Sequence, residues 1–289
     1  MTYPNVFVAG FPKCGTTSLA YYLSQHPDIF TTRPKELGYY SQSVRLNHKV
    51  PCPHYKTYLK KYSSARYTKI IVDTDPLVIY NARSIGQIYA HNPHAQFIIV
   101  IRNPIDAAIS LHGQHLKDPR NKMEFDFESA WKNAVVDCKM PLRENCYPKM
   151  YLYSEYVSNL LSLFDRDQVT FIKFDDFITD AVSVYNIILK FLNLDIGKLS
   201  LKIESYNPRG YRESNWHSRW LHSIAERTIS LRARLGISSI GLLNKLSPIK
   251  ELPKPKLSES FSQELKDYFR VDLIRFSKIT GIDFSSWIL

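Results

Sequence analysis

Short apolar runs alternate with longer stretches of helical periodicity over the first 200 residues. Residues 97–101 (FIIVI) contain no polar side chain, which is typical of a strand buried on both faces of a parallel sheet. Shorter apolar runs predict further strands at 5–9, 69–72 and 169–174. Helical patterns occur at 16–25, 77–90, from Pro104 onward, 127–138, 151–164 and 182–192. The alternation predicts an α/β fold in which helices connect parallel strands.

The last third of the chain has a different pattern. Turn residues predict a loop at 206–210 (YNPRG), and a basic helical stretch follows it. A final helix is predicted from about residue 257 to 279. We therefore expect one domain over residues 1–289, with an α/β core at 1–200 and a mostly helical part at 201–289.

Composition is that of a globular protein. Of the 289 residues 44% are hydrophobic, which suffices for one large core and argues against disorder. No run approaches the roughly 20 apolar residues of a membrane span, and we expect no secretory signal and no membrane association. The four cysteines, Cys14, Cys52, Cys138 and Cys146, show no CxxC spacing. We therefore expect neither a zinc site nor a disulfide framework, and a cytoplasmic location.

The formal net charge of +11 is concentrated late in the chain. Residues 209–256 hold ten Lys and Arg against three Glu, a local net charge of +7. Such a segment is either a solvated helix surface or a surface that attracts an anionic ligand or polyanion. Charge alone does not decide between the two.

A glycine-rich loop follows the first predicted strand. Gly10 and Gly15 have the spacing of a phosphate-binding P-loop, and a helix is predicted directly after them. A loop in this position directs backbone N–H groups and the positive end of a helix dipole at an anion. The lysine, however, is Lys13, and Thr16 occupies the place of the Walker lysine. The loop therefore suits a nucleotide phosphate but not the usual Mg-ATP site, and the alternative is an ordinary Gly/Pro turn.

A second candidate phosphate site follows the strand at 97–101. Arg102 closes this strand, and Ser110 lies eight positions later in the helix that Asn103 is expected to cap. Ligands of an open α/β sheet bind beyond the carboxyl ends of its strands. A guanidinium and a hydroxyl together suit a phosphate monoester. Taken singly, Arg102 is also compatible with a capping or ion-pair role.

These segments resemble the motifs of sulfotransferases that use 3′-phosphoadenosine 5′-phosphosulfate (PAPS). Residues 12–19 (PKCGTTSL) resemble the family's 5′-phosphosulfate loop, and residues 99–110 (IVIRNPIDAAIS) resemble its 3′-phosphate motif. Residues 169–177 (VTFIKFDDF) and 209–211 (RGY) resemble later family segments. Residues 279–287 (ITGIDFSSW) are similar to the tail of a bacterial branch related to heparan sulfate sulfotransferases.

The resemblance implies a P-loop-like parallel sheet flanked by helices, with PAPS as co-substrate and no metal. Lys13 would contact the phosphosulfate bridge and neutralise the leaving phosphate, while Arg102 and Ser110 would bind the 3′-phosphate. The implied donor-binding set is Lys13, Cys14, Gly15, Thr16, Thr17, Ser18, Arg102, Ser110, Arg209, Gly210 and Tyr211.

Glu36 is the candidate general base. Residues 35–40 (KELGYY) resemble a family segment in which the glutamate accepts the proton of the acceptor hydroxyl. The alternative is that Lys35 and Glu36 form a solvated charged pair. His112 and His115 are rival bases because they follow Ser110 on the same predicted helix.

One segment departs from the heparan-like pattern, which carries a lysine after the second strand. Here residues 73–76 (DTDP) replace it with additional carboxylate. Asp73 and Asp75 would repel a polyanionic sugar and suit a neutral or cationic acceptor, such as a guanidinium alkaloid. The alternative is that the two carboxylates bond loop amides of their own chain.

The sequence therefore predicts a PAPS-dependent sulfotransferase that acts on a hydroxyl or amine of a small molecule, in particular a secondary metabolite. Nucleic acid is not an expected partner, and the oligomeric state is not predicted. One rival function is that of a P-loop kinase or NTPase, which needs a lysine after Gly15. The other is a non-catalytic module that binds polyanions through residues 209–256.

Overall fold

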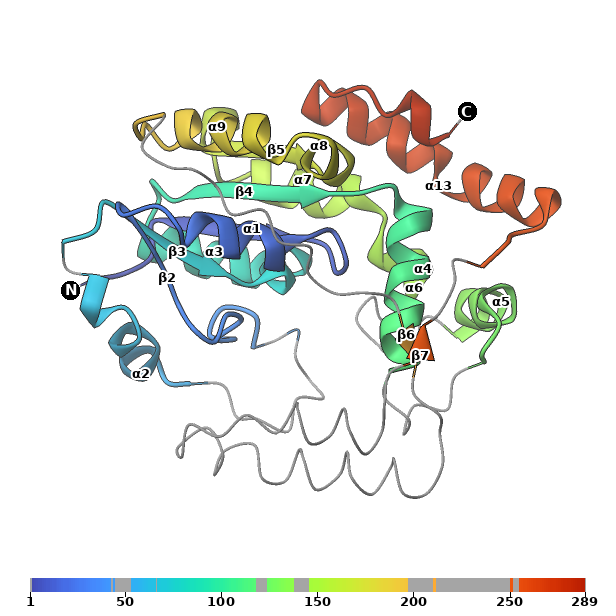
Figure 1. Cartoon of the computed structure of the whole chain (residues 1–289), viewed down its shortest axis with the longest axis horizontal. Coiled ribbons are helices and arrows are strands. Elements are labelled where there is room, and N and C mark those ends of the chain that lie inside the picture. The colour runs from blue at the N-terminus through green and yellow to red at the C-terminus, as the bar shows by residue number, and fades with distance from the viewer. Residues whose placement is uncertain are drawn as a thin grey trace, which may run out of the picture. The chain divides into compact units, whose positions relative to one another are not determined.

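The computed structural model (Figure 1) describes residues 2–42, 44, 53–65, 67–117, 124–137, 146–196, 210–211, 250–251 and 255–288. The chain folds into two compact units, each drawn from segments far apart in the sequence. The first, called the sheet unit, comprises Met1–Ala107, Met150–Tyr206 and Lys266–Leu289. The second, called the smaller unit, comprises Ala108–Lys149 and Asn207–Leu265. The predicted single domain with a change of structure near residue 200 stays a prediction.

A parallel sheet forms the centre of the sheet unit. Its strands in the described residues are β1 (Val6–Gly10), β2 (Ile29–Thr31), β3 (Ile70–Thr74), β4 (Gln96–Ile101) and β5 (Val169–Lys173). They lie in the order β2-β3-β1-β4-β5, and all neighbours run parallel. β4 is fully buried from Phe97 onward, as expected of a central strand that is covered on both faces. The predicted α/β fold with a parallel sheet is confirmed.

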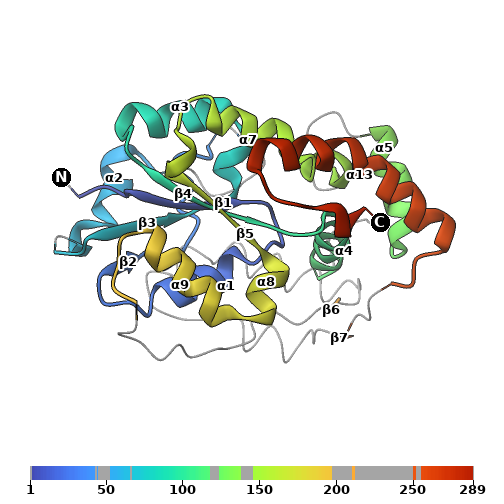
Figure 2. The ribbon, with the colours of Figure 1, turned by 90° about the horizontal axis from the view of Figure 1, so that it is seen from above.

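Helices cover both faces of this sheet (Figure 2). One face carries α3 (Ala82–His91) and α7 (Tyr153–Leu161), and the other carries α1 (Thr16–Leu23), α8 (Phe174–Thr179) and α9 (Ala181–Phe191). Aromatic rings pack on both sides: Tyr22 of α1 lies 5.2 Å from Phe177 of α8, between ring centroids. On the opposite face, Phe97 of β4 lies 4.7 Å from Phe164.

Two of the longer helices have residues in both units. α4 (Pro104–His115) follows β4, and α13 (Glu259–Thr280) is the last long helix. Asn103 caps α4 as predicted, because its Oδ1 accepts a hydrogen bond from the N–H of Ile105 at 3.0 Å. α13 confirms the predicted helical C-terminal part. Of the helices that the structure describes, none is long and apolar enough to cross a membrane.

The helix predicted at 77–90 is in fact two helices. A 3₁₀ helix at Pro76–Tyr80 comes first, and α3 begins only at Ala82. Asn81 between them has an extended backbone, and its Oδ1 accepts a hydrogen bond from the N–H of Arg83 at 2.8 Å. An asparagine that caps a new helix in this way ends the preceding one. The prediction of a single helix is therefore wrong at Asn81.

Other element boundaries shift by a few residues. The strand expected at 169–174 ends at Lys173, and α8 starts at the next residue. The helix expected at 151–164 is shorter, since α7 begins at Tyr153 and ends at Leu161. β2 escapes prediction because three residues are too few to show a period of two.

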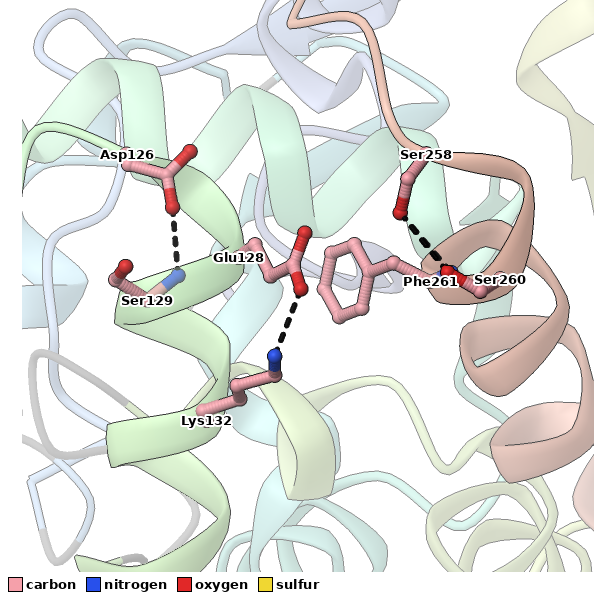
Figure 3. A network of polar contacts seen from close by, with 7 residues as sticks. All are labelled: Asp126, Glu128, Ser129, Lys132, Ser258, Ser260 and Phe261. Carbon is pink, nitrogen blue, oxygen red and sulfur yellow. Dashed lines mark hydrogen bonds and ion pairs between the residues drawn. The ribbon is translucent and has the colours of Figure 1, made fainter.

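Among the described residues, the smaller unit contains helices and one short strand pair. Its described elements include α5 (Phe127–Asp137), all but the last residue of α6 (Tyr147–Met150), and the antiparallel strands β6 (Gly210–Tyr211) and β7 (Lys250–Glu251). Figure 3 shows how polar contacts order the start of α5. The Asp126 carboxylate accepts from the N–H of Ser129 at 2.8 Å, and Lys132 pairs with Glu128 at 2.7 Å. The same lysine ammonium lies 6.0 Å from the ring centroid of Phe261.

The cysteines differ from expectation at one position. Cys146 is disulfide-bonded, and its partner lies outside the described residues. Cys14 is a free and buried thiol. The sequence argues against a disulfide framework, but the single disulfide at Cys146 shows that cysteines without CxxC spacing still pair.

The carboxyl ends of the strands bring the candidate residues to one edge of the sheet. β1 ends at Gly10, next to Val100 of β4, and Arg102 directly follows β4. β3 ends at Thr74 and β5 at Lys173. Open α/β sheets bind their ligands at this edge. The fold thus places the β1–α1 loop and Arg102 side by side.

We expect Gly10→Ala to lower the free energy of unfolding by about 2–4 kcal/mol. Gly10 has φ 137°, and a Cβ there would lie 2.6 Å from the Val100 carbonyl oxygen. Gly86→Ala is the control, since a Cβ at Gly86 in α3 meets nothing within 4 Å. This control should gain roughly 0.5–1 kcal/mol. Urea unfolding measures both, and equal stabilities for the two variants would contradict the close β1–β4 pairing.

Candidate functional site

The β1–α1 loop has the geometry of an anion-binding nest. Lys13 (φ 66°) and Gly15 (φ 96°) have left-handed backbone on either side of Cys14. The N–H of Cys14 donates to the carbonyl oxygen of Phe11 at 3.2 Å, which closes a tight turn. Left-handed residues within such a turn direct successive N–H groups toward a common centre, where an anion binds.

The start of α1 adds the positive end of a helix dipole to this loop. Gly15 occupies the N-cap position and has no side chain with which to cap, and the first turn holds no acidic residue. The N-cap side chain therefore bonds none of the first N–H groups of α1, and such groups at a helix start can bind an anion. Thr16 is buried, whereas Thr17 and Ser18 are partly exposed. Gly15 itself cannot be larger, because a Cβ would lie 2.5 Å from the Phe174 ring.

Arg102 joins this loop directly. Its Nη1 donates to the carbonyl oxygen of Lys13 at 3.2 Å, and its guanidinium lies 4.7 Å from the ring centroid of Phe174. Its Nε is buried and finds no hydrogen-bond acceptor among the described residues. A buried donor without an acceptor costs about 1–3 kcal/mol. An anionic ligand at this edge of the sheet would remove that cost.

Two tyrosines connect the loop to neighbouring elements. The Tyr153 hydroxyl donates to the carbonyl oxygen of Arg102 at 2.7 Å. The Tyr151 hydroxyl lies 3.0 Å from the carbonyl oxygen of Pro12 and 3.2 Å from that of Ala107, within reach of both acceptors. Sequence reasoning missed both residues, because a tyrosine in an apolar helical pattern looks like an ordinary core residue.

Cys14 has a structural role in the loop. Burial raises the pKa of its thiol to about 12, so the thiol stays protonated at neutral pH. A protonated and buried thiol is a poor nucleophile. Cys14 therefore fills the space beneath the loop and provides no reactive group.

Glu36 lies at the same edge of the sheet, next to β3. Its N–H donates to the carbonyl oxygen of Thr74, the last residue of β3, at 2.9 Å. Its carboxylate is partly exposed and pairs with the ammonium of Lys35. The charged pair that was the alternative interpretation is thus present, and its position beside a strand end remains compatible with a role in the site.

Backbone strain marks both predicted catalytic residues. Among the described residues, only Lys13, Glu36 and Asn193 are non-glycine residues with positive φ. Asn193 has a structural explanation, since hydrogen bonds from Asn193 to Lys190 and from Leu194 to Leu189 close the end of α9. Lys13 and Glu36 end no helix. Strained backbone of this kind clusters at functional sites.

His112 has both ring nitrogens engaged. Its Nε2 lies 3.1 Å from the carbonyl oxygen of Phe125, and its Nδ1 lies 3.2 Å from the hydroxyl of Tyr147. A carbonyl only accepts, so Nε2 carries the proton and Nδ1 accepts from the tyrosine. Burial lowers the pKa of His112. His115 packs near the same tyrosine, with ring centroids 6.1 Å apart. This geometry favours structural roles for the two histidines.

Asp73 and Asp75 are buried and bond their own chain. The Tyr58 hydroxyl donates to Asp73 Oδ2 at 2.6 Å. Asp75 accepts from the Ser41 hydroxyl at 2.6 Å and from the N–H of Leu77 at 3.1 Å. This is the arrangement expected if the carboxylates organise the loop after β3 rather than bind an acceptor.

The remaining candidates lie in the smaller unit or outside the described residues. Ser110 is partly buried on α4, and Gly210 and Tyr211 form β6. Arg209 lies outside the described residues, as does most of the basic segment 209–256. In the part of the chain that the structure describes, no cluster of His, Cys, Asp and Glu side chains could hold a metal ion.

A family model described as "Sulfotransferase family" matches residues 4–197, which include the loop, Arg102 and Glu36. The chain belongs to the sulfotransferase family. The matched residues hold all five strands of the described sheet. The family resemblance inferred from the sequence motifs is thus confirmed.

Curated sulfotransferases are similar over parts of their length. The membrane-associated sulfotransferase kil1 of Dictyostelium discoideum is 30% identical over 131 residues, which are 43% of this chain and 26% of that protein. Human heparan sulfate glucosamine 3-O-sulfotransferase 5 is 23% identical over 196 residues, 66% of this chain and 54% of that protein. The chain thus matches about half or less of the length of these two relatives.

One solved structure is similar in fold to this chain. The crystal structure of a sulfotransferase from Alicyclobacillus acidocaldarius superposes with a TM-score of 0.75 at 21% identity. The match covers 99% of each chain. It therefore supports the sulfotransferase fold for this sequence.

We expect glycine to be more stable than alanine at position 36 by about 1 kcal/mol, because Glu36 has φ 59°. The Lys35–Glu36 ion pair is lost in both Glu36→Gly and Glu36→Ala, so their difference reports the backbone alone. The control is the same pair of substitutions at Lys35, which lacks positive φ. There alanine should be the more stable by about 0.4–1 kcal/mol. Urea unfolding measures all four variants, and the same order at both positions would argue against strain.

Proposed function

We propose that this sulfotransferase uses PAPS as the sulfuryl donor and a hydroxyl or amine of a small molecule as the acceptor. One observation carries the proposal. The anion-binding loop at residues 11–18 and the buried Nε of Arg102 lie together at the carboxyl edge of one sheet, joined by the bond from Arg102 to Lys13. Two neighbouring anion sites suit a nucleotide that carries a phosphosulfate and a separate 3′-phosphate. The family and the motif resemblance support the same donor.

The proposed reaction is an in-line transfer. The acceptor oxygen or nitrogen forms a bond to sulfur while the bond between sulfur and the bridging oxygen of PAPS breaks. Negative charge then develops on the 5′-phosphate of the leaving nucleotide, and the ammonium of Lys13 stabilises it more in the transition state than before. Glu36 accepts the acceptor proton. Arg102 binds the 3′-phosphate. Ser110, Arg209, Gly210 and Tyr211 are expected donor contacts on the motif resemblance alone.

A P-loop kinase or NTPase is the less favoured function. The lysine that would contact the β- and γ-phosphates of ATP belongs directly after Gly15, and Thr16 stands there. The polyanion-binding alternative depends on residues 209–256, most of which lie outside the described residues.

The carboxylates at the strand ends do not define the acceptor class. The carboxylates of Asp73 and Asp75 already accept hydrogen bonds from their own chain, so we base no preference for a cationic acceptor or an alkaloid on them. A small hydroxyl- or amine-bearing metabolite is the proposed acceptor. A sugar hydroxyl is the second candidate, because one relative is named as a heparan sulfate glucosamine sulfotransferase.

The cytoplasmic location that the cysteine spacing predicts stays a prediction. The disulfide at Cys146 counts against it, because disulfides persist mainly in oxidising compartments. A compartment that contains glycans would also give a sugar acceptor access to the enzyme.

Arg102→Ala should weaken binding of 3′-phosphoadenosine 5′-phosphate (PAP) by roughly 2–3 kcal/mol, or about 30- to 150-fold. The reason is the loss of charge-assisted hydrogen bonds to the 3′-phosphate. Adenosine 5′-monophosphate, which lacks only that phosphate, is the matched ligand, and its affinity should fall at most about threefold. The PAP affinity of Arg102→Lys, which keeps the charge, should lie between those of the wild type and Arg102→Ala. Calorimetric titration measures these affinities, and an equal loss for both nucleotides would exclude a 3′-phosphate contact.

Glu36→Gln should lower kcat by about a hundredfold or more while PAP binds as in the wild type. The amide keeps the size of the side chain but does not accept a proton at neutral pH. The assay is release of PAP from PAPS with an acceptor found by screening phenols, amines and sugars. Lys35→Met, which removes the ion pair but keeps the carboxylate, is the control and should retain most activity. If kcat of the Glu36→Gln enzyme lay within a few fold of the wild-type value, Glu36 would not be the general base.

A further inference from the structure

The start of α7 is capped by a residue from the far end of the chain. Its own N-cap position is Leu152, whose side chain cannot accept a hydrogen bond. The carboxylate of Asp272, on α13, accepts from the N–H of Tyr153 at 2.7 Å and from the N–H of Ser154 at 3.2 Å. The Ser154 hydroxyl donates to the same carboxylate at 2.5 Å. Asp272 thus caps the N-terminus of α7, a role that the N-cap residue itself has in most helices.

Tyr153, the first residue of α7, reaches the donor site. Its hydroxyl donates to the carbonyl oxygen of Arg102 at 2.7 Å. Its ring lies 4.2 Å from the ring of Phe11 in the β1–α1 loop, and on the other side 5.4 Å from Phe276 of α13, between ring centroids. One tyrosine therefore contacts the loop, the arginine and the C-terminal helix.

The position of Tyr153 depends on the cap. Four N–H groups at a helix start lack intrahelical partners, and two of them here bond only through the Asp272 carboxylate. Hydrogen bonds to a carboxylate are among the strong ones, and a negative charge at this end also favours the helix dipole. Without the carboxylate the first turn of α7 would lose its fixed start, and Tyr153 lies within that turn.

We propose that Asp272 is a positioning residue for donor binding: it fixes the start of α7, and through the Tyr153 hydroxyl it holds Arg102 in place for the 3′-phosphate. The proposal rests on the proposed function, because its readout is the affinity for PAP. It goes beyond that function by assigning a role in the donor site to a residue of α13, which lies outside the family match at residues 4–197.

The test is a double-mutant cycle between Asp272→Asn and Tyr153→Phe. Asp272→Asn removes the charge at nearly constant size, and Tyr153→Phe removes only the hydroxyl. Calorimetric titration with PAP and with adenosine 5′-monophosphate follows both single variants and the double variant. Asp267→Asn is the matched control, because its carboxylate pairs with Arg270 on the exposed side of the same helix.

If Asp272 acts through Tyr153, each single variant should weaken PAP binding about tenfold, and the double variant hardly more than either. Effects that are coupled in one chain of contacts do not add. The affinity of these variants for adenosine 5′-monophosphate should change less than threefold, and so should the affinity of the Asp267→Asn control for PAP. Should Asp272→Asn fail to fold, Ser154→Ala removes a single hydrogen bond to the same carboxylate and should weaken PAP binding about threefold.

Two results would overturn the inference. The first is an Asp272→Asn, or Ser154→Ala, variant of lower stability that binds PAP as tightly as the wild type, which would make the cap purely structural. The second is multiplication of the two losses in the double variant, which would show independent effects. A wild-type protein that does not bind PAP would contradict the proposed function itself. The titration of the wild type shows this before any variant is measured.

Discussion

The hydrogen bond from Arg102 Nη1 to the carbonyl oxygen of Lys13 connects the ends of two neighbouring strands. It forms only because β1 and β4 pair closely up to their carboxyl ends, where Gly10 lies against the backbone of Val100. A side chain at position 10 would push the strands apart and separate the loop from the arginine. The candidate site therefore depends on one glycine contact and on the parallel register that produces it.

Several features at this edge of the sheet are energetically unfavourable. Lys13 and Glu36 have left-handed backbone, and the Nε of Arg102 is buried without an acceptor in the described residues. Natural sequences tolerate such features mainly at functional sites, where a ligand or a reaction uses them. A bound anion would accept the free donor and would fill the nest of N–H groups. The distribution of strain thus supports the same site as the family motifs, from independent physical grounds.

Local patterns in the sequence predict four of the five strands of the sheet, and they locate the two segments that we propose bind phosphate groups. The strand at 97–101 is uniformly apolar, and the loop at 10–18 has a distinctive spacing, so both are visible without a structure. The break between two helices at Asn81 is not visible in the sequence, because an asparagine can lie within a helix as well as cap the start of one. Tyr153 and Asp272 escape prediction for a different reason: their contact joins residues 119 positions apart, and neither carries a motif. The hydrogen bonds of Asp73 and Asp75 depend on Tyr58 and Ser41, whose proximity only the fold creates, while the role predicted for the two carboxylates at the acceptor stays a prediction.

The most direct test of the central claim is a crystal structure of the protein with PAP bound. The claim is that the loop and Arg102 form one site for the two phosphate groups of this nucleotide. The account predicts a 3′-phosphate oxygen within hydrogen-bonding distance of Arg102 Nε, about 2.7–3.2 Å, and the 5′-phosphate on the N–H groups at the start of α1. Density for PAP elsewhere in the molecule, with Arg102 Nε still lacking an acceptor, would contradict it.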